Sequence, residues 1–289
     1  MNAHAIEKII KSAQPKEFPD KTAYNSISLS QIVQISKATG VSSRQIEIMA
    51  LENGVMPERY ARNMKSFSPQ DQIALLKAQV SIVGLGGLGG TVVEILARIG
   101  IGILNVIDGD TFEESNLNRQ FLSIPEQMAK SKADAAAQRI KTINSAVEVK
   151  VHHRFLDAEN GVALLRHSNV CVDCLDNLKT RFILERLCKQ IKLPLVSAAL
   201  AGATAQVTTI FPQDQGLKLI YGAEEKVPPK GAETALGTLP YAVTFLAALE
   251  CAEVIKVILD KPGLLRNKLL VADLDDTVID IVTLCQPNF

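Results

Sequence analysis

The chain has 289 residues, of which 47% are hydrophobic and 21% are charged, so it can bury a sizeable core as one large or two small domains. Lysine plus arginine and aspartate plus glutamate number 31 each, and this balance gives no support for a general attraction to nucleic acid or to an anionic membrane. The first residues lack the basic-then-apolar pattern of a signal peptide, and the five cysteines favour reduced thiols and a cytoplasmic protein.

Residues 1–70 are predicted to form a helical N-terminal extension. Within it, residues 35–47 have the outline of a helix, a glycine turn and a capped helix, as in a helix-turn-helix. A DNA reader needs a basic face, but Lys37 and Arg44 are offset by nearby glutamates. A structural or dimer-supporting helical hairpin is therefore the favoured interpretation, and we expect no DNA binding.

A glycine-rich turn follows the predicted strand 80–83. A helix with apolar residues at helical intervals comes next, and a second strand, 104–107, ends in Asp108. Strand, glycine turn, helix and distal acid are the context that the dinucleotide fingerprint requires, since phosphates approach backbone N–H groups at the start of the helix. The glycines with this spacing are Gly84, Gly86 and Gly89. The pattern predicts a nucleotide site.

Strands and helices alternate from residue 80 to about residue 200, as in a parallel sheet with crossover helices. Three further helices are predicted at 132–143, 161–165 and 179–191, and three further strands at 147–152, 170–172 and 195–197.

After Pro194 the sequence becomes richer in threonine and valine. Residues 206–211 alternate like a half-buried antiparallel strand, and the loop 212–240 is rich in proline and glycine, as functional or mobile loops are. The helix 241–259 carries charged residues and is predicted to be buried rather than membrane-spanning; strands follow at 268–272 and 278–284. We therefore predict an α/β fold with a doubly wound, Rossmann-like, mostly parallel sheet and antiparallel C-terminal strands.

Polar and charged residues gather beyond the glycine turn, at positions that follow strands. They are Asp110, the run Ser115, Asn116, Leu117, Asn118, Arg119 and Gln120, the isolated Lys132, and Asp173, Asp176 and Asn177. Because the carboxyl ends of parallel strands meet at one sheet edge, these groups are expected around the nucleotide phosphates. An oxidoreductase that binds NAD would need only the glycine turn, so it is the disfavoured alternative.

These blocks resemble the ThiF/MoeB/HesA family, the bacterial relatives of ubiquitin-activating enzymes. The matching blocks, in order, are G-L-G-G-L-G, D-G-D, S-N-L-N-R-Q, a lysine thirteen residues after the arginine, and D-C-L-D-N, within residues 60–260. The resemblance implies an enzyme that binds ATP and Mg²⁺ and adenylates the C-terminal glycine carboxylate of a small ubiquitin-like carrier protein with a Gly-Gly tail. It implies that residues 71–289 form the ATP-binding adenylation domain, with a crossover loop at 212–240.

The resemblance also implies roles for individual residues. Arg119, Lys132 and Asn116 would contact phosphates, Asp108 would hold the ribose, and Asp176 would hold Mg²⁺. The remaining nucleotide-binding positions would be Gly84, Gly86, Gly87, Asp110, Ser115, Asn118, Gln120 and Asn177. Arg62 matches the family's Y-x-R arginine, which reaches the active site of the partner subunit, so a homodimer with composite sites is expected.

The chemistry agrees with these roles. A glycine carboxylate is ionised at neutral pH and needs no general base, so the barrier lies in bringing two anions together. We therefore expect Arg62, Arg119, Lys132 and Asp176 to form the adenylation machinery. In the alternative interpretation, Arg119 pairs with Asp110 on the surface and Lys132 is a solvated charge. Asp173 is the weaker candidate, since it could simply end its strand and cap the following turn.

The sequence departs from the family at its cysteines. Many relatives carry two C-x-x-C pairs for zinc, but here only Cys285 stands near the second pair, so we expect no zinc site. Cys171 and Cys174 have the spacing but fall in a predicted buried strand, and Cys188 and Cys251 are expected to be packing residues. The crossover loop has no cysteine to accept the acyl group, so the enzyme should stop at the acyl-adenylate or hand it to an external nucleophile.

Two alternatives to the carrier-activating enzyme remain open. One keeps the ATP chemistry and changes the acceptor to a modified tRNA base or a peptide. The other is a non-catalytic scaffold subunit of a heterodimer, which the presence of all the expected charged residues argues against.

Overall fold

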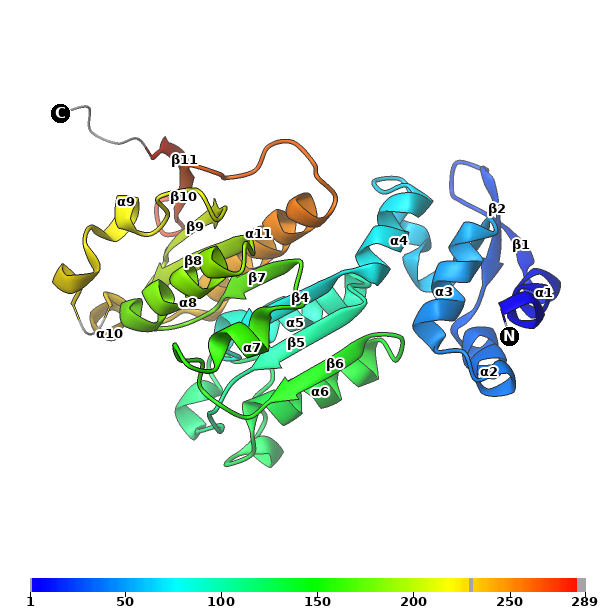
Figure 1. The fold of residues 1–289 in the computed structure, drawn as a ribbon, viewed down its shortest axis with the longest axis horizontal. Helices are drawn as coiled ribbons and strands as arrows, with labels where there is room; N and C mark the ends of the chain where they lie inside the picture. The colour runs from blue at the N-terminus through cyan, green and yellow to red at the C-terminus, as the bar shows by residue number, and fades with distance from the viewer. Residues whose placement is uncertain (1, 229–230, 285–289) are drawn as a thin grey trace.

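The computed structural model describes residues 2–228 and 231–284, and it confirms the predicted fold class. One sheet of eight strands has the order β11-β10-β9-β8-β7-β4-β5-β6 (Figure 1). The parallel strands are β4 (Gln79–Val83), β5 (Ile103–Ile107), β6 (Glu148–His152), β7 (Val170–Asp173) and β8 (Leu195–Ala201). The antiparallel strands are β9 (Thr204–Ile210), β10 (Lys268–Asp273) and β11 (Val278–Thr283).

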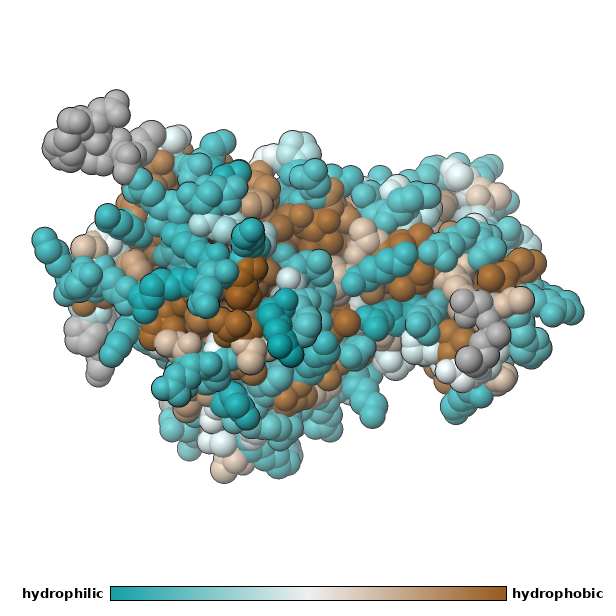
Figure 2. All heavy atoms as spheres, in the orientation of Figure 1, coloured by the Kyte–Doolittle hydropathy of each residue, from teal (hydrophilic) through white to brown (hydrophobic). Residues whose placement is uncertain are grey.

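Helices cover both faces of the sheet because successive strand residues point to opposite sides. In β4, Val80 and Ile82 join the core beneath α5 (Gly87–Ile99), α6 (Lys132–Ile143) and α11 (Pro240–Ile258). Strand residues that point to the other side of the sheet, such as Val83 in β4 and Cys171 in β7, join the second core beneath α7 (Gly161–Leu165) and α8 (Leu178–Gln190). On the face seen in Figure 2, hydrophilic side chains cover most of the surface and hydrophobic ones are exposed in separate patches.

The strand order reverses at β4. From this central strand the chain proceeds to β5 and β6 on one side, and it later returns to β7 and β8 on the other. In doubly wound sheets a ligand binds in the crevice at this reversal, outside the carboxyl ends of the strands. The glycine turn follows β4 and the segment 174–177 follows β7, so both lie at the reversal.

The N-terminal extension contains the predicted helices α1 (Asn2–Ser12), α2 (Leu29–Thr39) and α3 (Ser43–Glu52), and α4 (Pro69–Lys77) connects it to the sheet (Figure 1). It also contains a three-stranded sheet that we did not predict, with β1 (Gln14–Glu17), β2 (Ala23–Ile27) and β3 (Val55–Pro57). A 3₁₀ turn, η1 (Glu58–Asn63), follows β3. The predicted helical hairpin is present, because Gly40 ends α2 at φ +72° and Ser42 caps α3.

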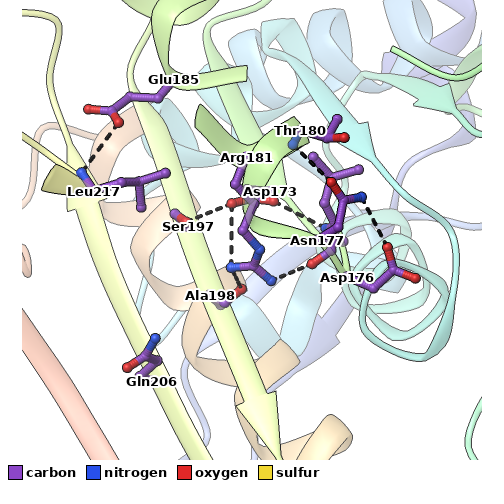
Figure 3. Close-up of polar contacts among 12 residues, drawn as sticks. Asp173, Asp176, Asn177, Thr180, Arg181, Glu185, Ser197, Ala198, Gln206 and Leu217 are labelled. Atoms are coloured by element: carbon purple, nitrogen blue, oxygen red, sulfur yellow. Dashed lines mark hydrogen bonds and ion pairs between the residues drawn. The ribbon is translucent and has the colours of Figure 1, made fainter. Parts of the chain in front are cut away.

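The predicted crossover loop includes short helical turns. They are α9 (Lys218–Tyr221), η4 (Glu224–Lys226) and α10 (Glu233–Leu236). The start of the loop is fixed to α8, where Glu185 accepts a hydrogen bond from the backbone N–H of Leu217 at 3.3 Å (Figure 3). Among the helices of the described chain, none combines the length and hydropathy that crossing a bilayer requires.

Candidate functional site

The glycine turn packs so tightly that side chains are excluded from it. Gly84 has φ +90°, and a Cβ there would lie 2.6 Å from the carbonyl oxygen of Cys174. A Cβ at Gly89 would lie 1.9 Å from the carbonyl oxygen of Gly84. Gly86 is the N-cap of α5 and supplies no side-chain cap, so the helix presents its first N–H groups uncapped by a side chain. Such a helix start attracts anions.

Asp108 lies beside this turn, as predicted. It is buried at the end of β5, where its Oδ2 accepts the backbone N–H of Leu85 at 2.6 Å and its Oδ1 accepts that of Asp110 at 2.8 Å. Each carboxylate oxygen can accept a further hydrogen bond, so the side chain can still receive a ribose hydroxyl.

Lys132 and Asp110 form an ion pair of 2.6 Å between Nζ and Oδ2. The lysine side chain is only 8% exposed, whereas that of Asp110 is 51% exposed. Burial is the largest influence on the pKa of the Asp110 carboxyl and raises it, but the hydrogen bond and charge of Lys132 and the backbone N–H of Thr111 together outweigh burial, so the pKa lies below its usual range. The alternative of a solvated helix-start lysine is therefore wrong.

Arg119 is not the partner of Asp110, so the surface-pair alternative is also wrong. Its Nη1 donates to the carbonyl of Ser115 at 3.0 Å and to Oδ1 of Asn118 at 2.7 Å, which are neutral acceptors. Within residues 2–228 and 231–284 the arginine forms no ion pair. The charge is therefore not compensated by a carboxylate and can act on an anionic ligand.

The loop that carries Arg119 touches both the glycine turn and the crossover segment. A Cβ at Gly87 would lie 3.2 Å from the carbonyl oxygen of Arg119. Asn118 donates to the carbonyl of Thr238 at 3.2 Å. Asn116 has a local role, because its Oδ1 accepts the backbone N–H of Glu113 at 3.1 Å.

Gln120 carries a buried polar atom that lacks a partner. The residue is 5% exposed, and its Oε1 accepts no hydrogen bond from the described residues. The Nε2 of the same side chain lies 3.7 Å from where a Cβ on Gly86 would stand. Buried acceptors are nearly always paired, so an unpaired one beside the glycine turn fits a ligand-binding surface.

A buried ion pair organises the segment after β7 (Figure 3). Asp173 is fully buried; it accepts hydrogen bonds from Ser197 Oγ at 2.7 Å and from the backbone N–H of Leu175 at 3.1 Å, and Arg181 Nη1 lies 3.6 Å away. Arg181 also donates to the carbonyls of Leu175 and Ala198. The prediction that Asp173 ends its strand and caps the following turn is confirmed.

Asp176 and Asn177 follow this anchored turn. Asp176 is exposed, and the hydrogen bond of 3.3 Å from Asn177 Nδ2 leaves most of its acceptor sites open. Asn177 caps α8 by accepting the backbone N–H of Thr180 at 2.9 Å. The described residues contain no cluster of three metal-type ligands. Mg²⁺ commonly binds one or two carboxylates together with substrate phosphates, so Asp176 fits such an ion.

Arg62 is not brought to this site. It lies on η1, where Tyr60 contacts the ends of α5 and α6 that are farthest from the glycine turn. A helix of 13 residues such as α5 is roughly 20 Å long, so Arg62 lies near the opposite edge of the sheet from Lys132 and Arg119. Of the four residues expected to form the adenylation machinery, Arg119, Lys132 and Asp176 follow the carboxyl ends of the parallel strands, and Arg62 is the exception.

Arg181 is a residue that the sequence analysis missed. The available signal was its position four residues after Asn177, one turn into a helix capped by that residue. Charged residues at this depth in a helix usually face solvent, so only the packed structure reveals its inward contacts.

Three of the four cysteines that we expected in the core are there, and the fourth, Cys174, lies just after β7 and is only partly buried. Cys171, Cys188 and Cys251 are buried free thiols, and burial raises the pKa of the Cys171 and Cys251 thiols. Cys285 lies outside the described residues, so the absence of zinc stays a prediction.

Comparison with known proteins identifies relatives for this arrangement. The sequence model of the ThiF family matches residues 60–288. The SAMP-activating enzyme E1 of Haloferax volcanii is 32% identical over 230 residues, which cover 78% of this chain and 84% of that enzyme. The adenylyltransferase and sulfurtransferase MOCS3 of Anopheles gambiae is 34% identical over 220 residues. The match covers 74% of this chain and 49% of MOCS3, so the chain spans about half the length of that relative.

Solved structures share the fold. E. coli MccB superposes with a TM-score of 0.68 at 21% identity, covering 98% of this chain and 87% of MccB. PaaA superposes with a TM-score of 0.64 at 24% identity, covering 79% of this chain and 82% of PaaA. The MccB match therefore includes the N-terminal extension, whereas the family match begins at residue 60.

Proposed function

This chain belongs to the ThiF family and is an adenylyltransferase, and from that membership we propose that it activates the C-terminal glycine carboxylate of a small ubiquitin-like carrier protein with ATP. The products are the acyl-adenylate and pyrophosphate. The observation that carries the proposal is that a buried lysine, Lys132, and an arginine without a carboxylate partner among the described residues, Arg119, both lie at the sheet edge that carries the glycine turn.

These groups suit a reaction between two anions. The attacking carboxylate is ionised at neutral pH, so no side chain has to remove a proton. Lys132, held by Asp110, and Arg119, held by neutral oxygens, are in place before the nucleotide arrives and need little reorganisation. Asp176 would hold Mg²⁺, which when bound screens phosphate charge, and Asn177 would lie beside it. Asp108 and Gln120 would orient the nucleoside.

We also propose a homodimer, because Arg62 and Lys132 lie at opposite edges of one protomer. An exposed arginine without an ion pair in the described residues is available to a second copy. In such a dimer, Arg62 of one protomer would complete the site of the other and stabilise charge on the phosphoryl oxygens. Arginines supplied across an interface in this way can accelerate phosphoryl chemistry by about a thousandfold or more.

A short peptide is the second candidate acceptor. The observation that favours it is the shared fold of the N-terminal extension with MccB, a Microcin C7 biosynthetic enzyme whose structure is known with N-formylated MccA. A carrier-activating enzyme and a peptide-activating enzyme would use the same nucleotide chemistry and differ only in the acceptor.

ATP–pyrophosphate exchange tests the proposal. We expect exchange only when an acceptor is present, and assays with Gly-Gly-terminated carriers and with synthetic peptides distinguish the two acceptor classes. Arg119→Ala and Asp176→Ala should each abolish most of the exchange. Undiminished exchange in both variants would refute the assigned site.

The second half-reaction is assigned to an external nucleophile, because residues 212–240 contain no cysteine. A thioester between carrier and enzyme that survives denaturant and is cleaved by thiol would contradict this assignment. A cytoplasmic location remains a prediction from the free thiols.

A further inference from the structure

Tyr60 occupies the junction between the N-terminal extension and the nucleotide-binding domain. It lies on η1, two residues before Arg62, and it is fully buried. Its hydroxyl donates to Oε2 of Glu47 on α3 at 3.0 Å and accepts from Nδ2 of Asn144 at the end of α6 at 3.0 Å. One hydroxyl therefore joins the two parts of the chain.

The end of α5 is also shaped around this ring. Gly100 caps the helix with φ +94°, and a Cβ at that position would lie 2.7 Å from Cε1 of Tyr60. Asn144 Nδ2 donates a second hydrogen bond, to the carbonyl of Ala97 in α5, at 3.0 Å. The ends of α5 and α6 are thus both fixed relative to the tyrosine.

A second tether lies on the other side of Arg62. Asn63 Nδ2 donates to Oε1 of Gln72 at 3.1 Å, and Nε2 of Gln72 donates to the carbonyl of Ile99 at 2.9 Å. Gln72 is fully buried. The turn is therefore held on both sides of an arginine that is itself exposed and forms no ion pair in the part of the chain that the structure describes.

A composite site would need an arginine whose backbone is held rigidly and whose guanidinium is free to contact the partner's ligand. An arginine that acts on the partner's nucleotide must keep its position relative to its own domain, since an error of about 1 Å can cost on the order of a hundredfold in rate. We propose that Tyr60 is a positioning residue for Arg62, and that its hydroxyl sets the place of η1 against α5 and α6. The role assigned to Tyr60 rests on the proposed function, because it assumes that Arg62 completes an adenylation site.

A double-mutant cycle tests this role with the full-length protein. The variants are Tyr60→Phe, Arg62→Ala and the double variant, with Ile9→Val as the control. Ile9 is fully buried in the core of the extension, so its truncation loosens the same part of the chain without touching the Tyr60 hydroxyl. Two quantities are measured: the ATP–pyrophosphate exchange rate, with the carrier or peptide that supports it in the wild type, and amide hydrogen exchange of residues 58–63.

Tyr60→Phe should lower the rate of pyrophosphate exchange by about tenfold or more, with little change in the KM for ATP. The double variant should be no slower than Arg62→Ala, because Tyr60 acts only through that arginine. Amides 58–63 should exchange faster in Tyr60→Phe and remain as in the wild type in Ile9→Val.

A rate for Tyr60→Phe equal to that of the wild type, or losses that multiply in the double variant, would overturn the inference. Full activity of Arg62→Ala would instead count against the proposed role of Arg62. If Arg62→Ala is fully active, or if the wild type shows no ATP–pyrophosphate exchange, amide hydrogen exchange of residues 58–63 still decides whether Tyr60 holds η1 in place.

Discussion

The ammonium nitrogen of Lys132 lies 2.6 Å from a carboxylate oxygen of Asp110, and the backbone N–H of Lys132 donates to the carbonyl of the same aspartate at 3.1 Å. The lysine is thereby fixed at both ends at the start of α6. Because Asp110 is half-exposed, water can compensate its charge if the lysine is neutralised. We therefore expect neutralising the lysine to affect the proposed reaction more than folding.

Lys132→Met should leave the fold intact and lower ATP–pyrophosphate exchange by about a hundredfold or more, since methionine fills the space of the buried lysine stem and removes the charge that we propose acts on the phosphates. The matched control is Lys130→Met, because Lys130 is exposed and forms no ion pair within the described residues. Similar rates for the two variants would show that the Lys132 charge is not used. Circular dichroism and thermal unfolding check that both variants fold.

Asp176→Asn should raise the Mg²⁺ concentration required for half-maximal activity by at least about tenfold, because the variant would remove the carboxylate that we propose holds Mg²⁺ together with the substrate phosphates. Excess Mg²⁺ should restore part of the rate. Asp276→Asn, an exposed carboxylate on the turn between β10 and β11, is the control. Identical Mg²⁺ titrations for Asp176→Asn and the wild type would remove Asp176 from the metal site.

Much of the nucleotide-binding edge could be predicted from the sequence because its signals are local. A β-branched strand, fixed glycine spacing and an acid at the end of the next strand determine the turn and place Asp108 beside it. The strands of the extension gave no such signal. All four residues of β1 are exposed, so no apolar alternation marks it.

The features of the site that could not be predicted from local sequence patterns depend on tertiary contacts. Arg181 can hold the segment after β7 in place because β8 brings the carbonyl oxygen of Ala198 within 2.5 Å of its guanidinium. This contact joins residues 17 apart in the sequence, so a local pattern does not reveal it. Arg62 has a motif, but its location at the far edge of the sheet depends on how Tyr60 packs against α5 and α6. The motif therefore suggests a role for Arg62, and because the residue lies far from Lys132 and Arg119 we propose that a second protomer is needed to fulfil it.

Two glycines of the turn should respond differently to alanine. Gly89→Ala places a methyl group 1.9 Å from the carbonyl oxygen of Gly84, so helix and turn must separate, and we expect a loss of stability of about 3 kcal/mol or more. Gly86→Ala meets only the Gln120 side chain, at 3.7 Å, and should unfold near the wild-type temperature. The second variant should nevertheless bind ATP more weakly, because the methyl group stands at the start of α5. Thermal unfolding and calorimetric titration with ATP separate the two effects, and equal unfolding temperatures would contradict the packing argument.

Glu47 should make the stability of the protein depend on pH near neutrality. Burial raises the pKa of its carboxyl from 4.5 to about 7, and neither Arg59, 3.5 Å away, nor the hydroxyl of Tyr60 fully offsets that burial. The folded state therefore favours the protonated acid. The stability that this preference contributes is fully present below about pH 4.5 and is lost as the pH rises through 7, with a total change of roughly 3 kcal/mol.

Glu47→Gln removes this ionisation and keeps an oxygen that can accept the hydrogen bond from Tyr60. The variant should be more stable than the wild type at pH 8.5, and the difference should shrink or reverse at pH 5.5. Urea unfolding at both pH values measures it, with Glu52→Gln as the control because the Glu52 side chain is 47% exposed and, among the described residues, forms an ion pair only with Lys77 at the surface. If the variant and the wild type differ by the same amount at both pH values, then Glu47 does not ionise near neutrality. The junction that holds Tyr60 would in that case be insensitive to pH.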